Sequence, residues 1–288
     1  MKAYLDLLKD ILENGIRKEN RTGIDVLGID SAIFKHDMST GFPIQTTKKV
    51  LLRLIASELE FFIKGITDKR WLQERDNHIW DEWCNPDKVS YGHDEDTKQR
   101  MKEERDLGPV YGFQWRHFGA EYCGYDADYT GKGVDQLAKL VNTLKKDPNN
   151  RRMIVSAWNP MDLGKMALPP CHYAFQVTTT EDRVNLFWNQ RSVDTVLGLP
   201  FNIAGYALLL HLLAKESGMK EGQLTGFLGD VHIYENHLKG VEEMLGRELY
   251  QLPKVETDNF SSIFDWNYKQ TKLLGYEHHP AIKFDVAV

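Results

Sequence analysis

Residues 187–202, FWNQRSVDTVLGLPFN, connect two segments whose patterns predict different secondary structures. Residues 184–189 are rich in β-branched and aromatic side chains, which is typical of a strand. Residues 200–217 are strongly apolar, begin with a proline and are followed by Gly218, as expected of a buried helix. A strand that leads into a buried helix indicates an α/β (α+β) fold.

The rest of the chain alternates between the same two patterns. The sequence predicts further helices at 2–14, 48–64, 134–146 and 231–246, and further strands at 153–158 and 172–180. For the helix at 48–64, Thr46 or Thr47 is a possible N-cap. No internal repeat or linker interrupts the pattern, so we expect one domain over residues 1–288 with polar surface inserts near 86–106 and 120–133.

The composition argues against several classes of protein. A net charge of −6 is unfavourable for a general affinity for nucleic acids or acidic membranes. Three cysteines at wide spacings indicate thiols in a reducing compartment, not a disulfide framework. Residues 1–15 are typical of an amphipathic helix, not of a signal peptide, and no apolar run approaches membrane-spanning length. We therefore expect a cytoplasmic protein with no membrane partner and no required nucleic acid.

Cys171 lies in the unusual stretch ALPPCHYAF, residues 167–175. Three interpretations compete: a buried structural thiol, a zinc ligand, and a nucleophile that two prolines hold on a stiff turn. The zinc pattern P-C-x-x-C fails because Ala174 occupies its fourth position and no H-x-E lies upstream, so we expect no metal. The nucleophile interpretation requires a nearby cation that favours the thiolate.

Arginines are candidates for that cation. Arg191 and Ser192 follow a predicted strand, Arg151 and Arg152 follow a helix stop, and Arg21 lies in the short loop NRTG. Each arginine taken alone could simply be a surface residue that makes the protein more soluble. Arg191, however, is embedded in an apolar segment, where a purely solubilising charge is out of place. Because the guanidinium fork suits phosphate, we expect these arginines to form a phosphate site.

Glu58 shares one face of the predicted helix at 48–64 with Leu51, Ile55 and Phe62, since these residues follow helical spacing. A carboxylate on an apolar face is costly to bury unless it is satisfied. It could be a structural acid paired with a distant arginine, or a proton donor or acceptor with a raised pKa. Periodicity alone leaves both interpretations open.

Other polar and aromatic residues also allow two interpretations each. Asn202 could cap the helix at 200–217, or its amide could read the O4 and N3–H edge of a uracil ring. His232 and Tyr234, two residues apart in GDVHIY, face the same side of an extended chain and could bind a sugar hydroxyl or be core polar groups. Trp80 in IWDEW could form a stacking wall for a flat ligand or belong to the core.

A series of short motifs runs along nearly the whole chain: NRTG, GFPIQTTKK, IWDEW, DLGPVYG, RRMIVSAWNP, MALPPCH, QRS, LGLPFNIA, GDVHIY and HPAIK. Together they resemble the folate-dependent, flavin-independent thymidylate synthase family. Each motif is weak, but their joint occurrence in this order is specific. The resemblance implies a single-domain fold in which a mixed β-sheet packs with helices and one sheet face forms a dimer interface.

The resemblance also implies an activity. The family's methyltransferases convert dUMP to dTMP by reductive methylation with 5,10-methylenetetrahydrofolate, a consumed cosubstrate that leaves as dihydrofolate. Cys171 would add to C6 of the pyrimidine and turn C5 into a carbon nucleophile. Two alternatives are a dUMP hydroxymethylase on the same fold, in which water captures the exocyclic methylene, and an idle relative that only binds ligands or RNA. Asn202 argues for uracil over cytosine, and the complete set of site residues argues against an idle relative.

The resemblance gives roles to individual residues. The catalytic residues would be Cys171, Glu58, Tyr111, Arg191 and Asp194. The residues that bind dUMP would be Arg21, Arg151, Arg152, Arg191, Ser192, Val193, Asp194, Asn202, His232 and Tyr234. Those that bind folate would be Leu51, Trp80, Asp194 and Ala287. Arg151 and Arg152 would be donated across an interface, which makes a homodimer obligatory for activity.

Several residues depart from the family pattern: Leu51, Glu60 and Phe61, Asn189, Ile24 and Asp25, and Phe284 and Asp285. None of them coincides with the nucleophile, the phosphate arginines or Asn202. These departures therefore bear on folate binding more than on the reaction.

Overall fold

The computed structural model describes residues 1–20 and 23–285. The elements follow one another as α1 (Lys2–Asn14), β1 (Ile16–Lys18), β2 (Val26–Asp37), η1 (Met38–Thr40), α2 (Leu52–Ile63), α3 (Arg70–Gln73), α4 (Glu95–Glu103), α5 (Tyr111–His117), α6 (Gln136–Lys146), β3 (Ile154–Ser156), η2 (Leu163–Lys165), β4 (His172–Thr180), β5 (Arg183–Gln190), β6 (Val193–Asp194), α7 (Gly198–Ser217), β7 (Lys220–Tyr234), η3 (Glu235–His237), α8 (Leu238–Leu245), β8 (Lys254–Thr257), η4 (Tyr268–Gln270) and β9 (Thr271–Leu274).

A mixed sheet forms the centre of the molecule. In the described part of the chain it has the order β1-β2-β7-β5-β4-β3, and the short β6 also pairs with β7. β7 runs parallel to β5 and β6 but antiparallel to β2, and β4 is antiparallel to both of its neighbours. The predicted mixed sheet packed with helices is confirmed.

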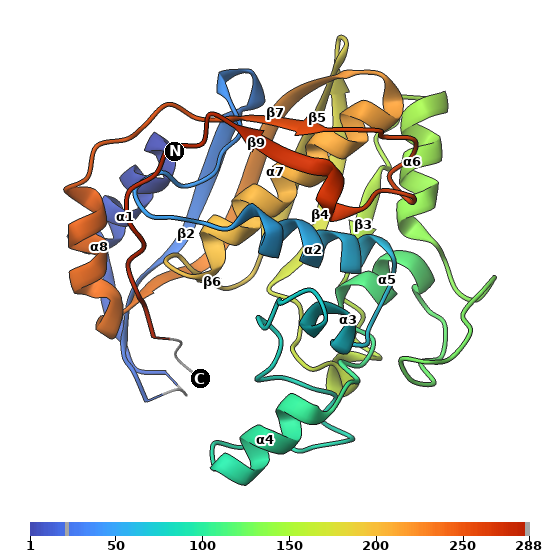
Figure 1. Ribbon diagram of the computed structural model, residues 1–288, viewed down its shortest axis with the longest axis horizontal. Helices are drawn as coiled ribbons and strands as arrows, with labels where there is room; N and C mark the ends of the chain where they lie inside the picture. The colour runs from blue at the N-terminus through green and yellow to red at the C-terminus, as the bar shows by residue number, and fades with distance from the viewer. Residues whose placement is uncertain (21–22, 286–288) are drawn as a thin grey trace.

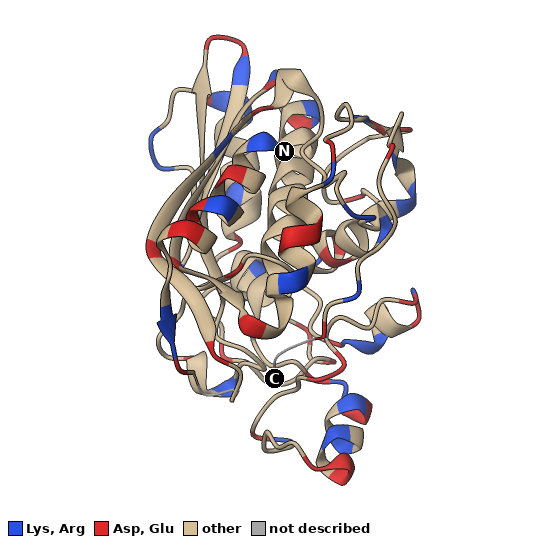
Figure 2. Ribbon diagram, turned by 90° about the vertical axis from the view of Figure 1, so that its left-hand side faces the viewer, with Lys and Arg blue, Asp and Glu red and all other residues tan. Residues whose placement is uncertain are grey.

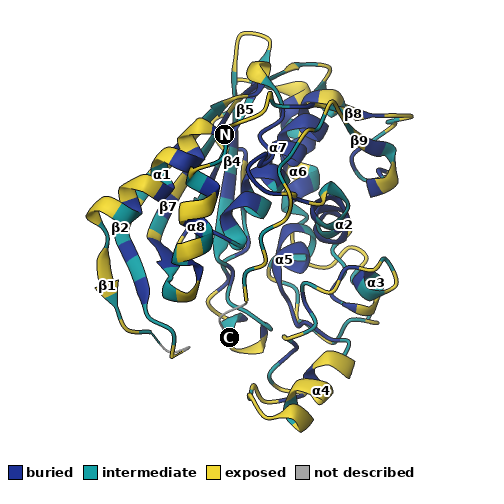
Figure 3. Ribbon diagram, turned by 60° about the vertical axis from the view of Figure 1, so that its left-hand side comes forward, coloured by how far each residue is buried: buried dark blue, intermediate teal, exposed yellow. Residues whose placement is uncertain are grey.

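One face of the sheet is covered by helices. Figure 1 shows α7 lying across the sheet, with α2 in front of it. α7 is buried along nearly its whole length (Figure 3), as expected of a helix that is apolar on all sides. The predicted stop is confirmed, since Gly218 takes the left-handed conformation with φ of 69°. The helix layer and the sheet thus enclose the main core.

The other face of the sheet carries exposed apolar side chains. Burial alternates along β5, as expected of a strand with one covered face. On the uncovered side, Ile33 of β2 lies directly opposite Phe227 of β7, and their side chains are 62% and 41% exposed. Phe187 of β5 contacts the Phe227 ring, and Ile154 on the edge strand β3 is 51% exposed. This strip is unusually apolar for a surface exposed to water.

Several predicted element bounds were right and others were not. The helix predicted at 2–14 is α1, and the one predicted at 134–146 is α6. The helix predicted at 48–64 begins only after Leu51, because residues 46 and 47 belong to a buried bend and do not cap it. The helix predicted at 231–246 is wrong in its first third. Those residues complete β7 and pair with β2, and helix α8 begins at Leu238.

The two predicted inserts differ in structure. Within 86–106 lies α4, which projects from the rest of the molecule and carries both signs of charge (Figure 2). Its one buried residue, Met101, packs in a small cluster with Cys84 and Val89. Residues 120–133 form turns and bends, most of them exposed or half-buried. No helix in the described part of the chain is long and apolar enough to cross a membrane.

Gly226 leaves room for a tryptophan ring to pack over the neighbouring strand at the centre of the sheet. It pairs with Trp188 in the β5–β7 ladder, and a Cβ atom at position 226 would lie 2.5 Å from Cζ2 of that ring. The Trp188 ring is fully buried and stacks on Tyr206 of α7 at 5.2 Å between centroids. The glycine is therefore required by close packing at the core.

We expect Gly226→Ala to destabilise the protein by about 1–3 kcal/mol, because the added methyl group overpacks a rigid ring in the core. Urea unfolding monitored by circular dichroism measures this loss. Gly164→Ala is the matched control, since no atom lies within 4 Å of its added Cβ. Equal stability of the two variants would contradict this account of the packing.

Candidate active site

The pairing of β4 with β5 brings Cys171 and Arg191 together. Cys171 directly precedes β4 and Arg191 directly follows β5, and the Arg191 backbone N–H donates to the Cys171 carbonyl at 2.9 Å. The guanidinium is fixed by the preceding turn, because Nε donates to Pro170 O at 3.0 Å and Nη2 to Pro169 O at 2.8 Å. Nη2 lies 3.9 Å from the Cys171 sulfur. The prolines thus orient both the thiol and its neighbouring cation.

Tyr111 approaches the cysteine from α5. Its hydroxyl accepts a hydrogen bond from the Cys171 backbone N–H at 2.9 Å, and its ring stacks on His172 at 4.3 Å and on Phe62 at 4.9 Å. Burial raises the pKa of Tyr111 well above its ordinary value, so the hydroxyl keeps its proton. Tyr111 can therefore donate a hydrogen bond toward a group that lies beside the cysteine.

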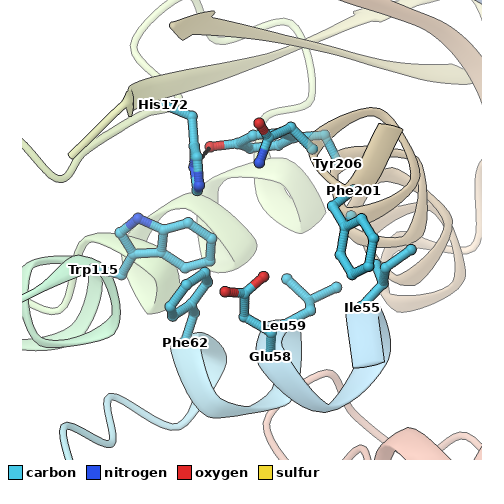
Figure 4. A pocket seen from close by; sticks show the side chains of 10 residues that line it. Ile55, Glu58, Leu59, Phe62, Trp115, His172, Phe201 and Tyr206 are labelled. Carbon is cyan, nitrogen blue, oxygen red and sulfur yellow. Dashed lines mark hydrogen bonds between the residues drawn. The ribbon is translucent and has the colours of Figure 1, made fainter. Parts of the chain in front are cut away.

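A pocket lies between α2 and α7, next to this loop (Figure 4). Glu58 points into it from α2, and His172 and Tyr206 lie on the opposite side. The residues that line it are Ile55, Glu58, Leu59, Phe62, Trp115, His172, Phe201, Asn202, Gly205 and Tyr206. The predicted helix face is confirmed for Ile55, Glu58 and Phe62, but not for Leu51, which precedes α2 and does not line the pocket. A single carboxylate thus faces largely apolar walls.

Glu58 accepts a hydrogen bond from the indole of a tryptophan. Trp80 Nε1 donates to Glu58 Oε1 at 2.8 Å. Burial raises the pKa of Glu58 from 4.5 to about 7, and the Trp80 bond opposes this shift only in part. Of the two interpretations left open by periodicity, the geometry favours a group that exchanges a proton near neutral pH over a carboxylate paired with an arginine.

The sequence analysis missed His172 and Tyr206. His172 Nδ1 lies 2.9 Å from the Tyr206 hydroxyl, and burial lowers the pKa of His172 to about 3, so the imidazole is neutral. Two weak signals were available. His172 directly follows Cys171, and Tyr206 lies four residues after Asn202, hence on the same face of α7.

Asn202 is held by its neighbours with its amide facing the pocket. It is the fifth residue of α7, whose N-cap is Leu197, so the capping interpretation is wrong. Its Oδ1 accepts from Gln190 Nε2 at 3.0 Å, and Gln190 Oε1 accepts from Trp188 Nε1 at 3.1 Å. This relay orients the Asn202 amide, which can still accept once more at Oδ1 and donate at Nδ2.

The pairing of β6 with β7 assembles a second group of predicted residues. Asp194 lies opposite His232, and the His232 and Tyr234 rings meet edge to face at 5.3 Å, which confirms their common side. Asp194 Oδ1 accepts from the backbone N–H groups of Val196 and Leu197 at 2.8 and 3.1 Å. It therefore orders the entry to α7. Val193, also predicted, is fully buried in β6.

The remaining predicted residues lie in different places. Ser192 is half-buried between Arg191 and β6, and Leu51 is 43% exposed at the start of α2. Arg151 and Arg152 are exposed before the edge strand β3, away from the pocket-lining residues. Arg21 and Ala287 lie outside the described residues.

A family model for thymidylate synthase matches residues 2–288. The chain belongs to the thymidylate synthase family. Its members are one-carbon transferases that methylate dUMP with methylenetetrahydrofolate as cosubstrate, so the predicted family and enzyme class are confirmed. Over residues 1–20 and 23–285, no group of three His, Cys, Asp or Glu side chains is placed to hold a metal ion.

The structure shows where three of the residues that depart from the family pattern lie. Glu60 is fully buried and turned toward the C-terminal segment, where its carboxylate accepts from Tyr268 N at 2.8 Å and pairs with Lys64 at 2.5 Å. Phe61 is buried and packs against Trp71. Asn189 lies on β5 opposite Phe227 of β7. None of the three lines the pocket.

We expect the stability of the protein relative to a Glu58→Gln variant to depend on pH. Because the folded-state pKa of Glu58 is raised, the folded state binds an extra proton between pH 4.5 and about 7, so the acid costs stability as pH rises through this range. The wild type should lose about 1–3 kcal/mol relative to Glu58→Gln between pH 5 and pH 8. Urea unfolding of both proteins at each pH measures the difference. A difference that does not change with pH would show that Glu58 titrates as an ordinary exposed acid.

Proposed function

We propose that this enzyme converts dUMP to dTMP by reductive methylation with 5,10-methylenetetrahydrofolate and releases dihydrofolate. The observation that carries the proposal is that Glu58, His172 and Asn202 line a single pocket next to the Cys171–Arg191 pair. The nucleophile, the proton-transfer group and the base-reading amide thus come from different elements of the fold. Membership of the thymidylate synthase family supplies the reaction class.

Cys171 is proposed to form a covalent bond from its sulfur to C6 of the uracil ring. The guanidinium of Arg191, 3.9 Å from the sulfur, stabilises the thiolate by charge attraction. Addition at C6 turns C5 into a carbon nucleophile that takes up the one-carbon unit of the folate. The C5 proton must then leave, and the protonated Tyr111 hydroxyl beside Cys171 N is placed to order the groups that accept it.

Asn202 is proposed to select uracil. The ring presents an acceptor at O4 and a donor at N3–H, which match the amide Nδ2 and Oδ1. Gln190 holds Oδ1 and so limits rotation of the amide. Cytosine would place a donor at C4 opposite the Nδ2 donor. Glu58, on the facing helix with a pKa near 7, would exchange protons at O4 through water.

The nucleotide's other groups are proposed to contact the surrounding loops. Arg191 and Ser192 would bind the phosphate, together with Arg21. The paired rings of His232 and Tyr234 would hold the deoxyribose hydroxyl. These roles agree with a phosphate held at the edge of the β4–β5 pair.

The folate is proposed to lie over the nucleotide, where it supplies the one-carbon unit and a hydride. Leu51 offers an exposed apolar side chain at the start of α2, and Asp194 presents a carboxylate at the entry to α7. Trp80 would shield the exocyclic methylene from water. A dUMP hydroxymethylase would share all of these contacts except the last, since water captures the methylene in that reaction.

A homodimer is proposed to form through the uncovered sheet face. The support is the exposed strip of Ile33, Phe227 and Ile154, which a second copy would remove from water. Arg151 and Arg152 lie beside the edge strand of the same sheet and are exposed, so they are free to enter the partner's phosphate site.

We expect Cys171→Ser to abolish turnover while dUMP binding, measured by calorimetry, stays within a few-fold of wild type, because the hydroxyl is a far weaker nucleophile. Mass spectrometry with 5-fluoro-dUMP and methylenetetrahydrofolate should show a covalent ternary complex in the wild type and none in Cys171→Ser. Cys123→Ser, at an exposed cysteine, is the control and should form the complex normally. Turnover by Cys171→Ser would overturn the nucleophile assignment.

We expect inactive Cys171→Ser and Arg151→Glu subunits to regain activity when mixed. A hybrid dimer then contains one site with an intact cysteine and an intact arginine from the partner. Activity after mixing and re-equilibration, with hybrids verified by native mass spectrometry, tests the donation. If hybrids form and stay inactive, the arginines act within their own subunit.

A further inference from the structure

Lys69 is a buried cation outside the pocket. It directly precedes α3 and is only 1% exposed. Its Nζ donates to the carbonyl oxygens of Trp83 at 2.8 Å and Asp81 at 3.2 Å, lies 3.5 Å from that of Trp80, and also bonds to that of Met101. A lysine is almost never buried to this degree unless its ammonium group is satisfied.

These carbonyls belong to two separate segments. Residues 80, 81 and 83 belong to the turn that carries the indole of Trp80, which we call the tryptophan turn. Met101 lies in the last turn of α4. Gln73 links the same two segments, since its Nε2 donates to Asp81 Oδ1 at 2.9 Å and to Lys102 O at 3.2 Å. The end of a helix leaves carbonyls without intrahelical partners and attracts cations. Lys69 and Gln73 therefore bind the end of α4 and the tryptophan turn at once.

The Trp80 side chain connects this turn to the pocket, because it is hydrogen-bonded to the lining residue Glu58. Trp80 is 7% exposed, donates to Glu58 and meets the Tyr111 ring edge to face at 6.0 Å. We propose that Lys69 is a positioning residue that holds Trp80 against Glu58, so that the projecting insert α4 takes part in shielding the active site from water. This inference rests on the proposed function, because it concerns how the methylene formed there is protected.

The electrostatic setting is consistent with a charged Lys69 in the working enzyme. Burial lowers its pKa to about 8, and electrostatic interactions with the Cys84 thiol and the carboxylates of Asp81 and Glu104 oppose that shift. The ammonium group thus remains mostly protonated at neutral pH. An apolar side chain in its place would leave the turn carbonyls buried without a donor, which is costly, so the turn would move.

A displaced Trp80 would alter how the reaction ends. In the normal route a hydride moves from tetrahydrofolate to the exocyclic methylene, a C–H bond forms, the folate is oxidised to dihydrofolate and the Cys171–C6 bond breaks. If water enters, its oxygen bonds to the methylene carbon, one proton goes to solvent, the Cys171–C6 bond breaks as the C5–C6 double bond re-forms, and the folate stays reduced. The ratio of hydroxymethyl-dUMP to dTMP therefore reports the position of Trp80.

The test is Lys69→Met in the full-length enzyme, with Lys98→Met as control. Lys98 lies on the insert helix α4 that Lys69 contacts, but its side chain is 47% exposed and pairs with the exposed Glu95. We expect Lys69→Met to lower kcat for dTMP by about tenfold or more, since a shift of about 1 Å at an active site can cost on the order of 100-fold. The hydroxymethyl product, measured by mass spectrometry, should rise, and the dUMP dissociation constant should stay unchanged. Lys98→Met should match the wild type in all three.

A double-mutant cycle separates positioning from general damage. If Lys69 acts through Trp80, adding Lys69→Met to Trp80→Phe should not change the product ratio further. Gln73→Met, at a partly exposed position, should shift the ratio in the same direction and serves if Lys69→Met does not fold. An unchanged ratio in the folded single variants, or an additive change in the cycle, overturns the inference. A wild type that makes no dTMP would instead refute the proposed function.

Discussion

The antiparallel pairing of β4 with β5 is the constraint on which the candidate site depends. The pairing joins the residue before one strand to the residue after the other, through the bond from Arg191 N to Cys171 O. Two prolyl carbonyls then fix the guanidinium beside the sulfur. A change of register by one residue would turn the side chains to the opposite face. The position of the proposed nucleophile is thus a property of the sheet, not of a mobile loop.

The helix layer adds what the sheet cannot supply. α2 and α7 face each other across the pocket, so that Glu58 from one helix lies opposite Tyr206 from the other, and Asn202 of α7 also lines the pocket. The apolar surroundings raise the pKa of Glu58 to about 7, while Trp80 supplies the hydrogen bond that makes its burial tolerable. The same burial that stabilises the core therefore tunes the proton-transfer group.

The sequence pattern was sufficient to predict features that depend only on residues close together in the sequence. The helical spacing of Ile55, Glu58 and Phe62 predicted their shared face, and the two-residue spacing of His232 and Tyr234 predicted that they face the same side of the chain. The strands β2 and β7 were not predicted. β7 contains three glycines, which weaken a strand pattern, and the need for one of them, Gly226, becomes clear only from the Trp188 ring packed against it.

Long-range partners could not be read from the sequence. Gln190 orients Asn202 across the fold, and Lys69 binds carbonyls up to 32 residues away. The helix predicted at 231–246 failed in its first third because pairing with β2 overrides the local propensity of those residues. The residues that orient the site are therefore harder to predict than those proposed to perform the chemistry, since their role exists only in the folded chain.

The most direct measurement is a single assay of the purified enzyme with dUMP and 5,10-methylenetetrahydrofolate. Dihydrofolate is followed by absorbance, and the nucleotide product is identified by mass. This account requires dihydrofolate and dTMP in a one-to-one ratio, because the hydride that completes the methyl group comes from the folate. Hydroxymethylated nucleotide without dihydrofolate would contradict it and show that water reaches the methylene despite Trp80.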